Sequence, residues 1–256
     1  MYQALQYIKF LLTSTNQHGV HSPFVYDLVT KCFYDKANHE SYPKLKSYRK
    51  ALRSNTDKIT ITDLGAGSRR FNAEERPVNK LAKTSGTTLK RAKLLFRIVK
   101  YLKPKHILEL GTSLGIATQA MALGNHEATV TSIEGCPNVS TLAKQHLDSF
   151  QVQNAVLKTG RFEDHLPMLS QHQWDLIFFD GNHQKEATLQ YFEQLLPSAH
   201  NGSVFIFDDI YWSKSMTEAW ETIKQHPKVT VTIDTFFWGM VFFRKEQAKE
   251  NFKIRL

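Results

Sequence analysis

The sequence predicts an α/β fold: a doubly wound, seven-stranded sheet that is mostly parallel, ends in an antiparallel hairpin and carries a helical extension at its N-terminus. From residue 106 onward, short apolar runs alternate with stretches of helical period, and such repeated units form parallel sheets with helices on both faces. Two β-branched and aromatic runs follow five of these units, at 229–233 and 238–243. Residues 234–237 between them are few enough to close an antiparallel hairpin.

Length and composition indicate a cytoplasmic protein. The 256 residues suffice for one α/β domain with an extension, and we expect the extension and a lid in residues 1–88 and the α/β domain in residues 89–256. The two cysteines, Cys32 and Cys136, lie far apart, which argues for a reducing compartment. No apolar stretch approaches the roughly 20 residues of a membrane span, so we expect no membrane partner.

The net charge of +9 is concentrated before the α/β part of the chain. Residues 41–105 hold eighteen Lys and Arg against four Asp and Glu, whereas residues 106–256 hold twelve against seventeen. This asymmetry predicts that the basic segment faces an anionic partner: an acidic substrate, a nucleic acid or a membrane surface. The alternative is a set of solvated helix faces with extended lysine side chains.

The extension is predicted to begin with two amphipathic helices, 2–15 and 23–34. Between them, His18 and His21 have no cysteine or carboxylate at metal-site spacing. Hydrogen-bonded turn histidines are therefore favoured over metal or substrate ligands. No role follows from the run 18–24 as a whole.

Two apolar runs end in glycine turns, 59–68 and 106–115, and both are typical of the start of a nucleotide site. After the first comes a polar, basic stretch and then a helix over 89–102, but no strand that ends in an acid at the required distance. We therefore interpret residues 63–67 as a turn and residues 69–86 as a candidate lid over the site.

The second run predicts the ligand site. Its strand ends in a turn with Gly111 and Gly115, which lets a bound group approach the backbone at the carboxyl end of the strand. The third glycine of the dinucleotide fingerprint is missing, so a ligand without phosphates is favoured. Glu134 ends the next strand, 128–133, roughly the 20 residues after the turn at which an acid accepts hydrogen bonds from ribose hydroxyls. The alternative for Glu134 is a surface residue of a turn.

Charged side chains follow the fourth and fifth predicted strands, 175–179 and 202–207. They are Asp180, with His183 three residues later, and the pair Asp208 and Asp209. Because the carboxyl ends of parallel strands share one rim, we expect these groups near the glycine turn. Clustered carboxylates favour a divalent cation with oxygen ligands, such as Mg²⁺. The alternatives are a direct ligand contact by Asp180 and N-capping by the pair.

The run 109–115, ELGTSLG, resembles the first motif of the class I S-adenosylmethionine-dependent methyltransferases, which have a Rossmann-like sheet with a terminal antiparallel hairpin. Over about 78–245 the chain is similar to the cation-dependent O-methyltransferases of the catechol and caffeoyl-CoA type. In that family an Asp after the fourth strand and an Asp-Asn pair after the fifth hold the metal ion. Asp180 and Asp208 match this pattern in position and separation.

Two residues depart from the family. Asp209 stands in place of the Asn, which raises the negative charge and leaves the metal preference open. His183 stands in place of the family's general base, a Lys three residues after the first Asp. An imidazole serves as a base near neutral pH with little tuning of its pKa.

The resemblance implies a methyltransferase that uses S-adenosylmethionine, acts on a hydroxyl of a small molecule, and is assisted by Mg²⁺ or another divalent cation. The basic segment described above favours an anionic acceptor. The residues implied in cofactor binding are Glu109, Gly111, Thr112, Ser113, Gly115, Glu134, Arg161, Phe162 and Asp180. The residues implied in catalysis are His183 and Asp180, and those implied in metal binding are Asp180, Asp208 and Asp209.

Two other functions stay open. A nucleic-acid methyltransferase would use the basic segment 41–105, but the chain has Asp180-Gly-Asn-His183 where base amino-methylases have an Asn/Asp-Pro-Pro-aromatic run. A non-catalytic nucleoside-binding module would keep the glycine turn and Glu134 without needing the further acids. The sequence is compatible with a homodimer.

Overall fold

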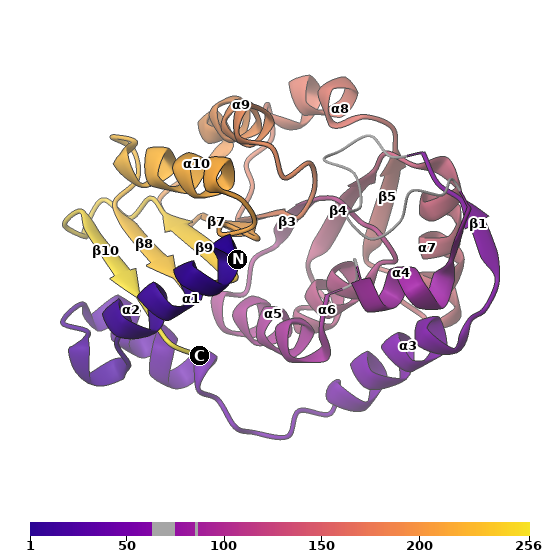
Figure 1. Ribbon diagram of the computed structural model, residues 1–256, viewed down its shortest axis with the longest axis horizontal. Helices are drawn as coiled ribbons and strands as arrows, with labels where there is room; N and C mark the ends of the chain where they lie inside the picture. Colours follow the sequence, from indigo (N-terminus) through magenta and orange to yellow (C-terminus); the bar gives the residue numbers. More distant parts are fainter. Residues whose placement is uncertain (63–74, 85–86) are drawn as a thin grey trace. The chain divides into compact units, whose positions relative to one another are not determined.

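The computed structural model describes residues 1–62, 75–84 and 87–256 (Figure 1). The chain forms two compact units: Asp35–His165 make up one, and Met1–Tyr34 together with Leu166–Leu256 make up the other. The predicted turn 63–67 lies outside the described residues, as do parts of the lid predicted over 69–86. The described part of that lid is not a loop, because residues 75–84 form a strand and a helix that buries Val78, Leu81 and Ala82.

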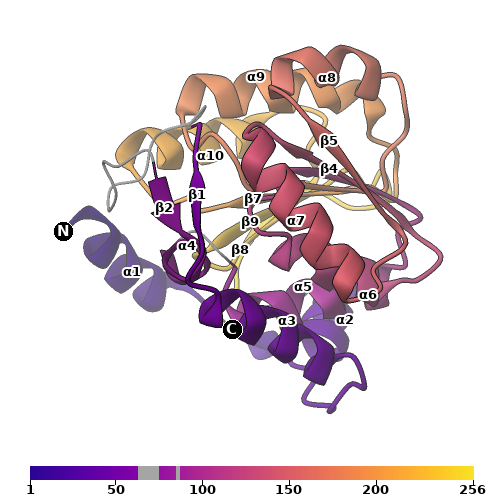
Figure 2. The same ribbon diagram turned by 90° about the vertical axis from the view of Figure 1, so that its right-hand side faces the viewer.

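The unit Asp35–His165 contains three parallel strands with helical crossovers. Its elements are α3 (Tyr42–Ser54), β1 (Lys58–Thr60), β2 (Glu75–Pro77), α4 (Val78–Thr84), α5 (Leu89–Leu102), β3 (His106–Leu110), α6 (Ile116–Gly124), β4 (Thr129–Glu134), α7 (Pro137–Ser149) and β5 (Ala155–Thr159). β4 lies between β3 and β5 and pairs parallel with both. α6 and α7 connect these strands, and Figure 2 shows α7 packed over β4 and β5. The predicted alternation of strand and helix is confirmed here.

The sequence interpretation missed α3 and treated its region only as a basic stretch. Leu45, Tyr48 and Leu52 follow a helical spacing and are almost fully buried, while the exposed lysines between them obscure this apolar pattern in the sequence. The strand β1 pairs antiparallel with β2 in a separate two-stranded sheet. The apolar run at 59–61 therefore does not belong to the parallel strands, in agreement with the choice of 106–115 as the ligand site.

The second unit has four further predicted strands and one that was not predicted. Its elements are α1 (Tyr2–Thr13), α2 (Pro23–Leu28), β6 (Leu176–Phe179), α9 (Lys185–Leu195), β7 (Val204–Asp208), α10 (Lys214–Gln225), β8 (Val231–Asp234), β9 (Trp238–Phe242) and β10 (Glu250–Lys253), with α8 (Phe162–Leu169) at its boundary. β6 and β7 are parallel, and β8 and β9 form the predicted antiparallel hairpin, with β9 next to β7. β10 adds parallel to β8, so the prediction of seven strands was one strand short.

The start of α10 has two serines that could cap it, Ser213 and Ser215, and the spacing of Ser215 and Glu218 is that of a capping box. Ser213 is the N-cap, and its hydroxyl accepts a hydrogen bond from the backbone N–H of Met216 at 3.1 Å. Glu218 instead forms an ion pair with Lys185 of α9 at 2.8 Å. Two serines close together made the cap ambiguous, and the extended backbone of Ser213 decides it.

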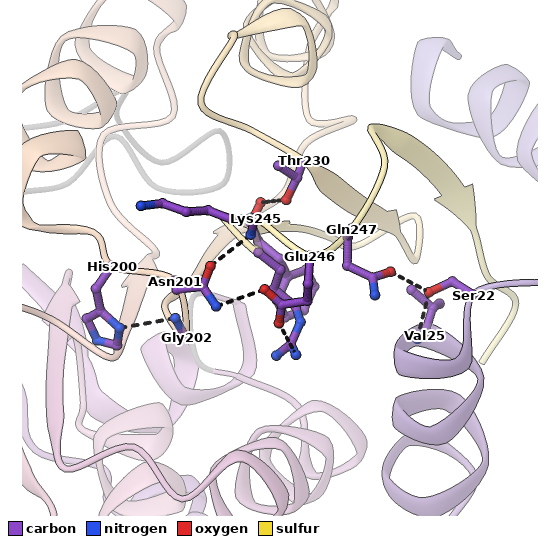
Figure 3. A network of polar contacts seen from close by, with 11 residues as sticks. Ser22, Val25, His200, Asn201, Gly202, Thr230, Lys245, Glu246 and Gln247 are labelled. Carbon is purple, nitrogen blue, oxygen red and sulfur yellow. Dashed lines mark hydrogen bonds and ion pairs between the residues drawn. The ribbon is translucent and has the colours of Figure 1, made fainter.

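The run 18–24, for which the sequence gives no role, belongs to a tie between the N-terminal and C-terminal segments of this unit (Figure 3). Ser22 caps α2 by accepting from the N–H of Val25, and its hydroxyl donates to Gln247 Oε1 at 2.9 Å. Nearby, Asn201 donates to Glu246 Oε2 at 3.0 Å and accepts from the N–H of Lys245 at 2.8 Å. Ser22 of this run therefore links the start of α2 to the C-terminal segment of this unit. In the described ranges, no helix has the length and apolar character needed to cross a bilayer.

Candidate functional site

The turn between β3 and α6 has an unusual backbone. Gly111, Ser113 and Gly115 all have positive φ, at 104°, 48° and 74°. The N–H groups of Gly111 and Thr112 both donate to the carbonyl of Ile133 in β4, at 3.0 and 3.1 Å, and the N–H of Gly115 closes the turn on the carbonyl of Thr112. Left-handed conformations are inexpensive for glycine but strained for serine, so the surrounding contacts must hold this turn in place.

Glu134 joins this turn to the end of β4. Its Oε2 accepts from the backbone N–H of Ser113 at 2.8 Å, and its Oε1 accepts from the N–H of Cys136 at 2.9 Å. Burial raises the pKa of Glu134, and the hydrogen bonds from Cys136 and Ser113 work against that rise. Because each carboxylate oxygen can accept two hydrogen bonds, Glu134 keeps capacity for hydroxyl groups of a ligand.

Glu109 lies beneath the turn and is fully buried. Its Oε2 accepts from the hydroxyls of Thr118 and Ser132, each at 2.5 Å, while its Oε1 has no hydrogen-bond partner in the described part of the chain. Burial raises the pKa of Glu109 from 4.5 to about 8, against the opposing effect of the two hydroxyls. The carboxyl group is therefore mostly neutral at pH 7 and joins β3, β4 and α6.

The sequence interpretation missed the two hydroxyl partners of Glu109. Ser132 lies in the middle of an apolar strand and Thr118 on the buried face of α6, and both are fully buried. A polar residue at a position that the strand pattern assigns to the core is the one signal that could have pointed to Ser132.

The end of β5 lies beside the end of β4. The N–H of Gly160 donates to the carbonyl of Glu134 at 3.0 Å, and Thr159 is paired with Glu134 in the register of the two strands. Arg161 follows with a side chain that is 65% exposed and lies 3.6 Å from Glu163. Phe162 begins α8. The structure thus gathers the turn after β3, Glu134 and the residues after β5 along the carboxyl ends of three adjacent strands.

In the other unit, the strand register places Asp180 and Asp208 side by side. Phe179 pairs with Phe207 in the parallel strands β6 and β7, and the next residue of each strand is the predicted aspartate. Asp208 is buried, and Asp209 follows it with a left-handed backbone, φ 52°. The separation between Asp180 and Asp208 in the sequence, on which the family resemblance relies, therefore corresponds to the step from one strand to its neighbour.

The predicted base, His183, lies next to Asp180. Its Nε2 is 3.9 Å from Asp180 Oδ1, and its ring centroid is 6.4 Å from that of Trp212. The loop between them is held by Asn182, whose backbone is left-handed and whose side-chain amide donates to the hydroxyl of Tyr191 at 3.0 Å. The side chains of His183 and Asp180 are 23% and 17% exposed, which leaves the pair partly open to a small molecule.

A divalent cation has less support from the geometry. Within residues 1–62, 75–84 and 87–256, no three or more His, Cys, Asp and Glu side chains come together in a group that could hold a metal ion. Asp180, Asp208 and Asp209 thus do not fit a three-ligand site in this structure. The prediction of a metal ion stays a prediction, and no chemical step below uses one.

Known proteins resemble this chain both in sequence and in fold. The sequence pattern of the family described as a methyltransferase domain matches residues 108–210. A catechol O-methyltransferase of Niastella koreensis is 29% identical over 126 residues, which are 47% of this chain and 56% of that protein. The chain thus matches little more than half the length of this relative.

Solved structures of low sequence identity share the fold. The S-adenosylhomocysteine-bound methyltransferase of Podospora anserina has a TM-score of 0.62 at 14% identity and covers 88% of this chain and 97% of its own. The Bacillus cereus O-methyltransferase in complex with S-adenosylhomocysteine has a TM-score of 0.55 at 18% identity and covers 85% of this chain and 96% of its own. The predicted fold class and the predicted resemblance are confirmed: residues 108–210 match the sequence pattern of a methyltransferase domain, and the chain has the Rossmann-like fold of these two methyltransferases.

Proposed function

We propose that this protein transfers a methyl group from S-adenosylmethionine to a hydroxyl oxygen of a small molecule. The observation that carries the proposal is the hydrogen bond from the N–H of Ser113 to Glu134. It joins the glycine turn after β3 to the acid after β4, the two features that a nucleoside site at the carboxyl ends of parallel strands requires. The relative named catechol O-methyltransferase supports oxygen as the methyl acceptor.

The residues of the cofactor half have distinct roles in this proposal. Gly111, Thr112, Ser113 and Gly115 supply a backbone turn against which the cofactor lies, and Glu134 accepts from its ribose hydroxyls. Arg161 and Phe162 border the nucleoside at the end of β5. Glu109 acts from below: its neutral carboxyl group supports the turn through the hydroxyls of Thr118 and Ser132.

The acceptor is handled by Asp180 and His183. Bound S-adenosylmethionine supplies an electrophilic methyl group on a sulfonium centre, so the chain mainly has to align the acceptor oxygen and remove its proton. His183 takes this proton at its imidazole, and Asp180, 3.9 Å away, stabilises the imidazolium that results. Bound S-adenosylmethionine would give its methyl group to the acceptor oxygen and leave as a neutral thioether, while His183 keeps the proton of the acceptor.

The basic segment supports an anionic acceptor. Its described residues, 41–62, 75–84 and 87–105, include sixteen Lys and Arg against two Asp and Glu. The same charge supports the second candidate, a nucleic-acid methyltransferase. The two differ in their response to salt, because a polyanion bound through many phosphates dissociates steeply as salt rises, whereas a small acceptor does not.

The first test is cofactor binding. Titration with S-adenosylhomocysteine should show saturable binding and raise the melting temperature, while NAD should do neither. Glu134→Ala should remove most of the binding. Glu127→Ala is the matched control, because Glu127 is an exposed acid just before the opposite end of β4 and should leave binding unchanged. Full affinity in Glu134→Ala would refute the ribose role of Glu134, and no binding to the parent would refute the proposed function.

A further inference from the structure

The glycine turn is held from outside the strand–helix core by one side chain of α3. The hydroxyl of Tyr48 donates to the carbonyl of Leu114 at 2.9 Å, and both residues are almost completely buried. Leu114 lies between the two left-handed residues Ser113 and Gly115. The hydrogen bond therefore fixes the peptide group at the centre of the strained part of the turn.

The fit between Tyr48 and the turn is close. A Cβ atom at Gly115 would lie 2.6 Å from the Tyr48 hydroxyl and 3.3 Å from Leu147 of α7. Gly115 is thus needed here both for its positive φ and because the tyrosine hydroxyl occupies the space beside it. Burial raises the pKa of Tyr48 well above its usual value, so the hydroxyl stays protonated and remains a donor.

The ring of Tyr48 is held by α7, the helix that follows Glu134. The ring centroids of His146 and Phe150 lie 4.2 and 5.0 Å from that of Tyr48. The backbone carbonyl of Tyr48 also lies 3.2 Å from His146 Nε2. Tyr48 therefore contacts both the turn after β3, which carries proposed cofactor residues, and the helix that follows Glu134.

We propose that Tyr48 is a positioning residue for cofactor binding: its hydroxyl holds the turn 111–115 in the conformation that receives S-adenosylmethionine. The inference rests on the proposed function. It assigns part of the N-terminal extension, whose only predicted feature in this region is its charge, to the cofactor site. Tyr48 need not touch the cofactor. Its hydroxyl holds the carbonyl of Leu114, and the N–H of Ser113 in the same turn binds Glu134.

The test removes only the hydroxyl. Tyr48→Phe should raise the Kd for S-adenosylhomocysteine and the KM for S-adenosylmethionine about tenfold, the effect of one lost hydrogen bond, while kcat at saturation changes less than about twofold. Tyr34→Phe is the matched control, since the Tyr34 hydroxyl also donates to a backbone carbonyl, that of Arg255, at 2.7 Å. It removes the same kind of hydrogen bond away from the turn and should leave the Kd unchanged.

Three outcomes would overturn the inference: parent affinity in folded Tyr48→Phe, an equal loss in Tyr34→Phe, or a fall in kcat without a change in Kd. If Tyr48→Phe does not fold, Phe150→Leu replaces it, because this variant keeps the hydroxyl and loosens only the ring contact. It should raise the Kd about two- to threefold, and an unchanged Kd overturns the inference. A parent protein that binds no S-adenosylhomocysteine would refute the proposed function itself, which separates the two failures.

Discussion

Glu109→Gln should change how the stability of the protein depends on pH. The native carboxyl group has a pKa of about 8, whereas the ordinary value is 4.5. At pH values between these two, the unfolded chain has lost the proton that the native protein still holds. Unfolding then releases a proton, so the free energy of unfolding falls as pH rises.

The size of this effect follows from the two pKa values. Each pH unit between them corresponds to about 1.4 kcal/mol, so the loss of stability approaches about 5 kcal/mol once the pH exceeds 8. Below pH 4.5 both states are protonated and no loss occurs. Glutamine keeps the size of the side chain, and its carbonyl oxygen can accept from the hydroxyls of Thr118 and Ser132, but it does not titrate. The stability of the variant minus that of the parent should therefore grow with pH.

Urea unfolding of both proteins at several pH values from about 5 to about 8 measures this difference. We expect it to increase by about 4 kcal/mol across that range in favour of the variant, on top of a constant offset from repacking. The matched control is Glu127→Gln, the same substitution at an exposed glutamate just before β4, which removes no buried carboxyl group. A flat difference for Glu109→Gln would mean that Glu109 is ionised in the native protein, which would refute the reasoning.

Three other predictions concern the acceptor side. His183→Gln should lower kcat by about 10²- to 10⁴-fold with cofactor affinity nearly unchanged, and the acidic limb of the pH–rate profile should disappear; loss of cofactor binding with turnover preserved would instead make His183 a cofactor contact. If a divalent cation assists the reaction, a chelator should abolish turnover, Mg²⁺ or Mn²⁺ should restore it, and Asp208→Ala should not be rescued; turnover that ignores the chelator would reject the metal. Charge reversal on the exposed face of α3, Lys46→Glu with Lys50→Glu, should raise the acceptor KM at low salt and less at high salt, and an unchanged KM would leave these lysines as solvated residues.

The strands and the glycine turn were predictable because each has a local cause. An apolar run that ends at a glycine, followed by a small-residue helix, has one common structural solution, and Glu134 then falls at the required distance. The neighbouring positions of Asp180 and Asp208 were predictable for a similar reason, since both directly follow buried apolar strands. The sequence did not predict the contacts between segments that are far apart in the chain.

The features that the sequence interpretation missed all depend on contacts between distant segments. The Tyr48 hydroxyl donates to a carbonyl 66 residues away in the sequence, and the Ser132 hydroxyl in β4 donates to Glu109 in the neighbouring strand β3. The edge strand β10, Glu250–Lys253, is short and mostly polar, and only its pairing with β8 makes it a strand. No local pattern distinguishes these contacts from those of ordinary buried or exposed residues.

The two groups of proposed site residues are held in different ways, and this difference affects how substrate specificity can change. The turn 111–115 is fixed mainly through backbone groups: its N–H and C=O groups bind Ile133, Glu134 and Tyr48. A site made from backbone tolerates little change in the ligand that it receives. Residues 180–184 and 209–213 instead lie in loops after β6 and β7, each with one left-handed residue, and the first loop carries the side chains proposed for the chemistry. Loops on a rigid scaffold accept substitution more readily, so variants with altered acceptor preference should be sought in these two loops.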